Sequence, residues 1–174
     1  MTKNLSRLLC FFTILTVAGS FGLADEPSET SQKTIAELNA YWKEVSRSVR
    51  EGDFAGYAAT CHPEGVLVSG SKKSSYPLSQ ALEGWKPGFD DTLAKRMEAS
   101  VEFRFSQRLI GTQTAHETGI FRYATSRDGE EAVAFIHFEG LLKKTPNGWQ
   151  ILMEYQKSEA TEAEWKTLAP IGNE

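Results

Sequence analysis

Two spacings of apolar residues divide the chain into a helical part and a strand-rich part. Between Thr34 and Gly52 apolar residues recur every three or four positions, the stripe of an amphipathic helix, and Thr34 with Glu37 forms a capping box at its start. Asp53 can cap a short second helix. A third apolar stripe follows Pro77 and is expected to end at the next proline-glycine pair. The pattern predicts two helices before the first strand and one after it.

A period of two takes over near residue 100. Alternating apolar and polar residues predict four long strands, at 101–106, 114–125, 132–144 and 149–157, after a shorter strand, VLVS, at 66–69. Asp128-Gly129 and Asn147-Gly148 are hairpin signals. Strands joined by short turns form an antiparallel meander, so we expect an α+β fold with the helices packed on one face of the sheet. The stretch FDDTLAKRMEA, 89–99, fits either a further helical turn or an ordered loop.

The N-terminal residues have the form of a secretory signal peptide. Lys3 and Arg7 precede an apolar run, and small residues end at Ala24, so we expect cleavage after Ala24 and export to the periplasm or the extracellular space. No later segment is long and apolar enough to span a membrane. We expect a signal peptide (1–24), a flexible leader (25–33), one domain (34–158) and a C-terminal tail that can hold a short helix (159–174).

Composition argues against several classes of function. The formal net charge is -4, and no basic patch indicates a nucleic acid or a membrane as partner. The three histidines lack the spacing of zinc ligands, and there is no glycine-rich phosphate loop, so we expect neither a metal nor a cofactor. After cleavage of the signal peptide Cys61 is the remaining cysteine, which excludes an internal disulfide.

The order of the elements, together with YAATCHPEGVLVSG, TAHETGIFRY, HFEGLLKK and GWQILMEYQKS, resembles the SnoaL-like family of the nuclear transport factor 2-like superfamily. Within that family the likeness is to the group named domain of unknown function 4440, and it covers residues 34–157. The resemblance implies a cone, in which a strongly bent sheet wraps partly around a long N-terminal helix and leaves a pocket at its open end. It also implies a homodimer formed through the outer sheet surface.

The resemblance does not decide the function. The superfamily includes isomerases, dehydratases, polyketide cyclases and epoxide hydrolases, alongside binding and transport proteins. No complete catalytic set of these enzymes maps onto the chain.

His137 and Glu139 are the strongest candidates for chemistry. They lie two residues apart in the predicted strand VAFIHFEGLL, so they project from the same face. On a pocket wall they can act as a general base and its orienting carboxylate, with Tyr155 as donor to a developing oxyanion. Otherwise one of them lies toward the sheet edge, solvated or paired with Lys157 or Arg104.

Several other residues are candidates for contact with a ligand. His116 and Glu117 are adjacent on a predicted strand, so only one of them can face the pocket, and the sequence leaves open which. Aromatic residues on the predicted helices can line an apolar cavity or simply belong to the core. In the closing strand, alternation puts Trp149, Ile151, Met153 and Tyr155 on one face and Gln150, Leu152, Glu154 and Gln156 on the other. The candidate ligand-binding residues are Trp42, Tyr57, Tyr76, Trp85, Glu117 and Met153.

Three hypotheses follow. The first is an exported protein that binds a small, largely apolar molecule in its pocket without chemistry. The second is an acid-base enzyme of isomerase, dehydratase or cyclase type. The third is an oligomer-forming interaction domain whose pocket is filled by its own side chains. Titratable groups that converge in the pocket would separate the second hypothesis from the first.

Overall fold

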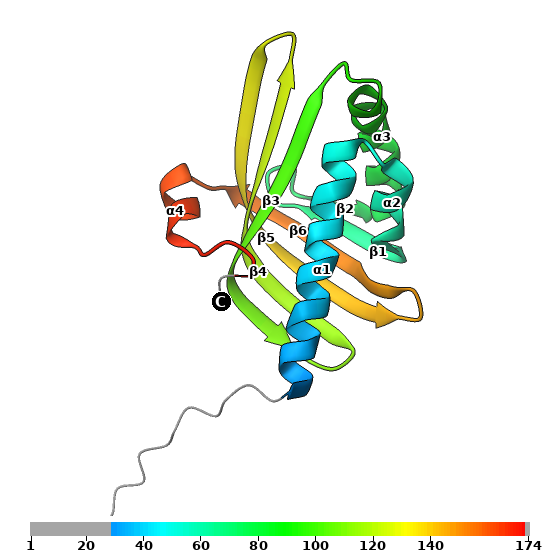
Figure 1. Cartoon of the computed structure of the whole chain (residues 1–174), viewed down its shortest axis with the longest axis vertical. Coiled ribbons are helices and arrows are strands. Elements are labelled where there is room, and N and C mark those ends of the chain that lie inside the picture. The colour runs from blue at the N-terminus through cyan, green and yellow to red at the C-terminus, as the bar shows by residue number, and fades with distance from the viewer. Residues whose placement is uncertain (1–28, 173–174) are drawn as a thin grey trace, which may run out of the picture.

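The computed structural model describes residues 29–172 and shows helices packed against one curved sheet (Figure 1). The predicted signal peptide and the first residues of the predicted leader, 25–28, lie outside the described residues. The elements, in chain order, are α1 (Glu29–Glu51), α2 (Phe54–Ala59), β1 (Cys61–Ser69), β2 (Ser74–Pro77), α3 (Leu78–Leu93), β3 (Glu98–Ile110), β4 (Thr114–Arg127), β5 (Glu130–Thr145), β6 (Gly148–Glu159) and α4 (Glu162–Thr167).

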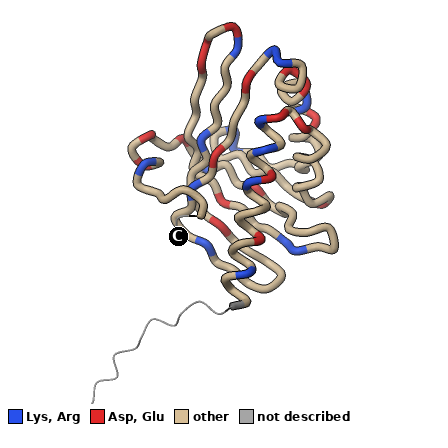
Figure 2. Tube along the Cα trace, in the orientation of Figure 1, with Lys and Arg blue, Asp and Glu red and all other residues tan. Residues whose placement is uncertain are grey.

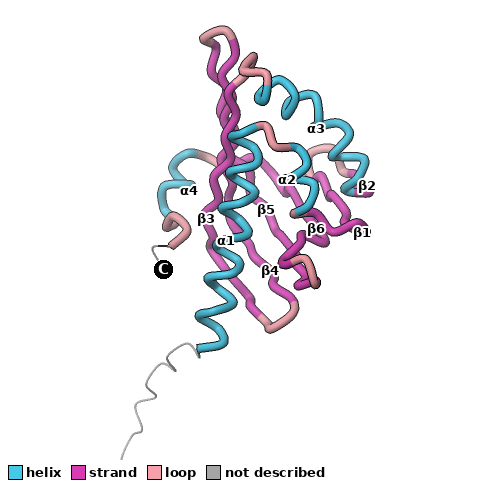
Figure 3. The backbone as a smooth tube through the Cα atoms, turned by 45° about the vertical axis from the view of Figure 1, so that its right-hand side comes forward, coloured by secondary structure: helices cyan, strands magenta, loops and turns pink. Residues whose placement is uncertain are grey.

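The six strands form one sheet in the order β2-β1-β6-β5-β4-β3. β1 runs parallel to β6, and the other neighbouring pairs are antiparallel. Helices α1, α2 and α3 cover one face, whereas α4 lies on the other (Figure 3). The α+β architecture and the antiparallel meander predicted from the sequence are confirmed.

Local chemistry explains the turns and the bend of the sheet. Asp128 and Gly129 both have positive φ, 53° and 84°, as the two-residue hairpin predicted there requires. Ser106 is an extra residue in β3 opposite Gly119 of β4. A Cβ atom at Gly119 would lie 2.0 Å from the carbonyl oxygen of Arg104, so glycine permits the close approach of the two strands at this bulge.

The apolar stripe of α1 packs into the curved face of the sheet. Trp42 is buried among rings from two strands, with its ring centroid 4.4 Å from that of Phe103 and 5.5 Å from that of Phe105, both of β3. Phe138 of β5 contacts the same group, at 5.7 Å from Trp42. This aromatic cluster fills one part of the interior.

A buried ion pair joins α1 to the sheet beside this cluster. Glu117 of β4 has a fully buried side chain, and Arg108 of β3 donates from Nε to its Oε1 at 2.5 Å. Trp42 Nε1 donates to Oε2 at 2.5 Å, and Arg108 Nη1 donates to Asn39 Oδ1 at 2.6 Å. Two residues of α1 therefore share one polar network with two strands, and this network positions the helix.

Several boundaries differ from those expected from the sequence. α1 already includes residues 29–33, so this part of the predicted leader is helical; the Thr34 hydroxyl donates to the Thr30 carbonyl instead of capping the helix. α3 continues through Pro87 to Leu93 because Phe89 and Thr92, beyond the proline, are buried against the core. The stretch after Pro87 is thus partly helical. β1 begins at Cys61 rather than at residue 66.

Charged residues of both signs are interspersed along the described chain, as Figure 2 shows. Within residues 29–172 no helix is long and apolar enough to cross a membrane. Among the same residues no three His, Cys, Asp or Glu side chains are grouped so that they could hold a metal ion.

We expect Glu117→Gln to lower the free energy of unfolding by about 3–5 kcal/mol, because it leaves the buried Arg108 guanidinium without its countercharge. Urea denaturation measures this loss. Glu102→Gln is the matched control: Glu102 pairs with Arg122 at 3.2 Å on the surface, and such pairs contribute at most about 1 kcal/mol. Similar losses in the free energy of unfolding in both variants would show that the buried ion pair stabilises the fold no more than the surface pair does.

Candidate functional site

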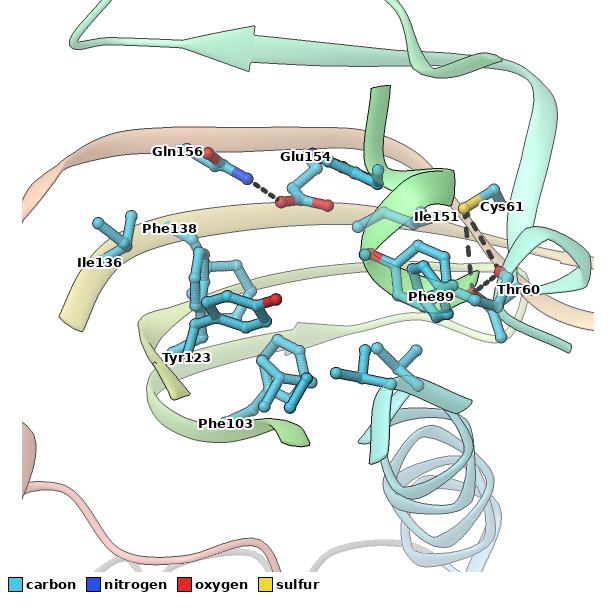
Figure 4. A pocket seen from close by; sticks show the side chains of 18 of the residues that line it. Thr60, Cys61, Phe89, Phe103, Tyr123, Ile136, Phe138, Ile151, Glu154 and Gln156 are labelled. Carbon is cyan, nitrogen blue, oxygen red and sulfur yellow. Dashed lines mark hydrogen bonds between the residues drawn. The ribbon is translucent and has the colours of Figure 1, made fainter. Parts of the chain in front are cut away.

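A cavity of about 540 Å³ lies between the helices and the curved face of the sheet. This volume lies within the range of small-molecule sites, roughly 300–1,000 Å³. Helices α1, α2 and α3 and five of the strands contribute to its wall. The wall is mostly apolar and rich in aromatic rings (Figure 4). Trp85 and Phe89 of α3 and Tyr57 of α2 form one side: the Tyr57 ring centroid lies 5.0 Å from that of Phe89 and 6.0 Å from that of Trp85.

Glu154 of β6 is the acidic residue of the wall. Its carboxyl group points into the cavity, and Gln156 Nε2 donates to its Oε1 at 2.7 Å (Figure 4). The Glu154 side chain is half-buried and lines the cavity. Burial raises the pKa of this carboxyl above its ordinary value, and the hydrogen bond from Gln156 opposes that shift only in part.

The tyrosines and the cysteine of the wall remain protonated near neutral pH. Burial raises the pKa of Tyr41 and that of Tyr57 well above the ordinary value, and the charge of Glu154 adds to both shifts. The Tyr41 hydroxyl donates to the carbonyl of Thr60 at 3.3 Å. Burial also raises the pKa of Cys61 to about 12. Its thiol is therefore not an activated nucleophile.

A bulge in β6 decides which of its residues face the cavity. Ile151 pairs with Leu142 and Met153 with Leu141, so Leu152 is an extra residue in the ladder. The bulge shifts the alternation by one position. Ile151 and Glu154, three residues apart, therefore line the same wall.

Two sequence predictions fail for this reason. Met153 and Tyr155 were expected on the pocket face with Ile151, but neither lines the cavity. Unbroken alternation, on which the prediction depended, ends at the bulge.

His137 and Glu139 share one face of β5, as predicted, but it is the outer face. Ile136 and Phe138 point into the cavity, so the residues that alternate with them point away from it. His137 Nε2 lies 3.4 Å from Glu164 Oε1 of α4, whereas Glu139 accepts from Lys157 Nζ at 2.6 Å. The prediction that His137 and Glu139 form a pair on the pocket wall is wrong. The alternative that one of them pairs with Lys157 is the one observed.

The choice between His116 and Glu117 is also settled. Glu117 points inward and His116 outward, where its Nε2 lies 3.2 Å from Glu139 Oε2. Glu117 does not line the cavity, because its carboxylate is held by Arg108 and Trp42 within the core.

Of the aromatic candidates, Trp42, Tyr57 and Trp85 line the cavity. Tyr76 lies on the edge strand β2, half-buried against the core, and does not line it. Sequence reasoning missed Glu154. An acid within the apolar strand ILMEYQ is a signal for such a site, but the alternation assigned it to the opposite face.

Comparison with known proteins identifies the fold. No family model matches the chain, and no curated protein matches it. Solved structures do: the fold is that of the nuclear transport factor 2-like superfamily. A superfamily protein from Salmonella enterica serovar Typhimurium is 13% identical with a TM-score of 0.57, and the match covers 75% of this chain and 94% of that one.

Two further structures show the range of related proteins. A Mycobacterium tuberculosis protein of unknown function is 12% identical with a TM-score of 0.62, over 84% of this chain and 83% of its own. A ketosteroid isomerase-like protein from Erwinia carotovora atroseptica is 15% identical with a TM-score of 0.53, over 77% of this chain and 98% of its own. At these sequence identities the structural similarity shows a shared fold alone.

We expect Glu154→Gln to raise the free energy of unfolding at about pH 8, by roughly 1.4 kcal/mol for each unit by which the pKa of Glu154 is raised. At about pH 4 we expect little change. The folded pKa exceeds the unfolded one, so the wild type loses stability as pH rises from the ordinary carboxyl pKa through the raised value; glutamine does not ionise. Urea denaturation at both pH values measures the difference. A variant destabilised at the higher pH would mean that the fold favours the carboxylate.

Proposed function

We propose that this protein binds a small, largely apolar molecule in the cavity, as a SnoaL-like member of the superfamily in the group named domain of unknown function 4440. The observation that carries the proposal is a cavity of about 540 Å³ with an aromatic wall and a polar pair, Glu154 and Gln156, on one side. Apolar surface provides affinity, and a few placed polar groups orient the ligand.

The size of the cavity favours binding over a vestigial pocket. A pocket of a purely structural domain is expected to be filled by its own side chains, because interiors pack densely. Each 100 Å² of apolar ligand surface removed from water contributes about 2.5 kcal/mol, before the entropic cost of association. A ligand of one or two rings is therefore sufficient for measurable affinity.

A cavity-filling substitution tests this proposal. We expect the uncharged fluorescent probe N-phenyl-1-naphthylamine to bind the wild type. Ala99 lines the cavity, so Ala99→Phe adds a ring that occupies part of the cavity volume, and we expect it to weaken probe binding by at least about tenfold. Fluorescence titration measures the affinity, and thermal unfolding checks that the variant is folded.

Ser100→Phe is the matched control. Ser100 is the next residue of β3 and points to the opposite face, so the same ring is added outside the cavity. Undiminished binding to Ala99→Phe, or no binding to the wild type, would count against the cavity as the binding site.

A second candidate function is acid-base catalysis of the isomerase, dehydratase or cyclase type. The observation that favours it is Glu154, a cavity carboxyl whose pKa is raised by burial. A carboxyl group with a pKa nearer to neutrality can both accept and return a proton. The hydroxyl of Tyr57, also on the wall, is the type of hydrogen-bond donor that stabilises a developing oxyanion. In this form Glu154 and Tyr57 take the roles first assigned to His137, Glu139 and Tyr155.

Proton exchange tests the catalytic candidate. If Glu154 abstracts protons beside a carbonyl, the wild type accelerates deuterium incorporation into a cyclic enone in D₂O, and Glu154→Gln reduces the rate by about 100-fold or more. Proton NMR follows the exchange. An equal rate in both proteins would remove Glu154 as the base, while probe binding would be unaffected.

We also propose that the protein is exported and acts as a homodimer. Export is supported by the signal-peptide form of residues 1–24. Dimerisation through the outer sheet face is supported by the resemblance described above. On that face α4 packs Trp165 against the sheet, with Arg104 over its ring at 4.4 Å, so the pairing surface is the part that α4 leaves uncovered.

A further inference from the structure

The cavity wall carries an acid but no base. Glu154 lines it, whereas no lysine, arginine or histidine of the described residues does. The carboxyl group accepts one hydrogen bond, from Gln156, and within residues 29–172 no cationic side chain forms an ion pair with it. The other interior carboxylate, Glu117, is paired with Arg108. The fold thus supplies a countercharge for one interior acid and leaves the other to face the cavity.

Aromatic rings lie on both sides of the Glu154 carboxyl group. The Glu154 carboxyl points into the space with Phe138 and Tyr123 on one side and Phe89 on the other (Figure 4). Tyr57 lies beside Phe89, at 5.0 Å between ring centroids. Ring faces are negative and attract cations, most strongly where water is excluded.

We propose that the ligand is a small hydrophobic amine, whose ammonium group pairs with the Glu154 carboxylate and whose apolar body fills the aromatic part of the cavity. This inference rests on the proposed function, since it assumes that the cavity binds a small molecule. An ammonium group restores the charge balance that the wall lacks, and the aromatic faces stabilise it further. An anionic ligand would instead meet an uncompensated negative charge.

The pairing has a defined pH dependence. The ammonium binds the ionised form of Glu154, so affinity rises as pH increases through the raised pKa of this carboxyl, and falls only where the amine itself loses its proton. A neutral ligand that accepts a hydrogen bond from the protonated carboxyl follows the opposite course.

Two nearly isosteric probes test the inference on the intact chain: 1-naphthylmethylamine and 1-naphthylmethanol, compared by isothermal titration calorimetry. We expect the wild type to bind the amine at least about tenfold more tightly than the alcohol near neutral pH, as a charge-assisted hydrogen bond implies. Glu154→Gln should abolish this preference and keep the weaker, charge-independent binding. Glu102→Gln removes a surface carboxylate outside the cavity and should leave the preference unchanged.

The outcomes distinguish this inference from the proposed function. Equal affinity for the two probes, tighter binding of the alcohol, or an amine preference that survives in Glu154→Gln would overturn the amine as ligand class while leaving the binding cavity intact. Failure of both probes and of N-phenyl-1-naphthylamine would overturn the proposed function itself. The pH dependence of amine binding to the wild type is a second test that needs no variant: affinity that does not rise between about pH 4 and pH 8 would also overturn the inference.

Discussion

The ion pair between Arg108 and Glu117, with the indole of Trp42 as a further donor, is the constraint on which the rest of the interior depends. Buried charges are tolerated only where partners satisfy them, and here one of the partners lies on α1. The long helix is therefore fixed in rotation and in register against β3 and β4. Its aromatic side chains fill the space beside the ion pair, whereas the space next to α2 and α3 stays open as the cavity.

The interior holds two carboxyl groups in contrasting environments. Glu117 is enclosed by donors from a helix and a strand, so its charge is part of the fold. Glu154 has a single amide donor and faces the cavity, and burial raises its pKa. Because the ionised form of Glu154 lowers the stability of the fold, a role in binding explains this residue better than a role in stability. This contrast, rather than the presence of an acid alone, identifies Glu154 as the centre of the site.

Much of the fold was predictable from the sequence, because the long strands alternate cleanly and their turns contain Asp128-Gly129 and Asn147-Gly148. The site was less predictable. Alternation shows which residues share a face but not which face is inside, and so His137 and Glu139 were placed together but on the wrong side. Tertiary packing also overrode local signals: buried residues beyond Pro87 carry α3 past a proline expected to end it. The bulge at Leu152 has no signature in residue type, although it determines which side chains of β6 reach the cavity.

The bulge at Leu152 determines which functional groups of β6 reach the cavity wall. Before Leu152 the strand contributes Ile151 to the wall, and after it the strand contributes a carboxyl and an amide. A one-residue slip of β6 that absorbed the bulge would instead pair Met153 with Gly140 and Tyr155 with Phe138, and would bring the thioether of Met153 and the phenol of Tyr155 to the same wall. A shift in strand register of one residue can therefore convert an acidic cavity wall into a neutral one without a new fold.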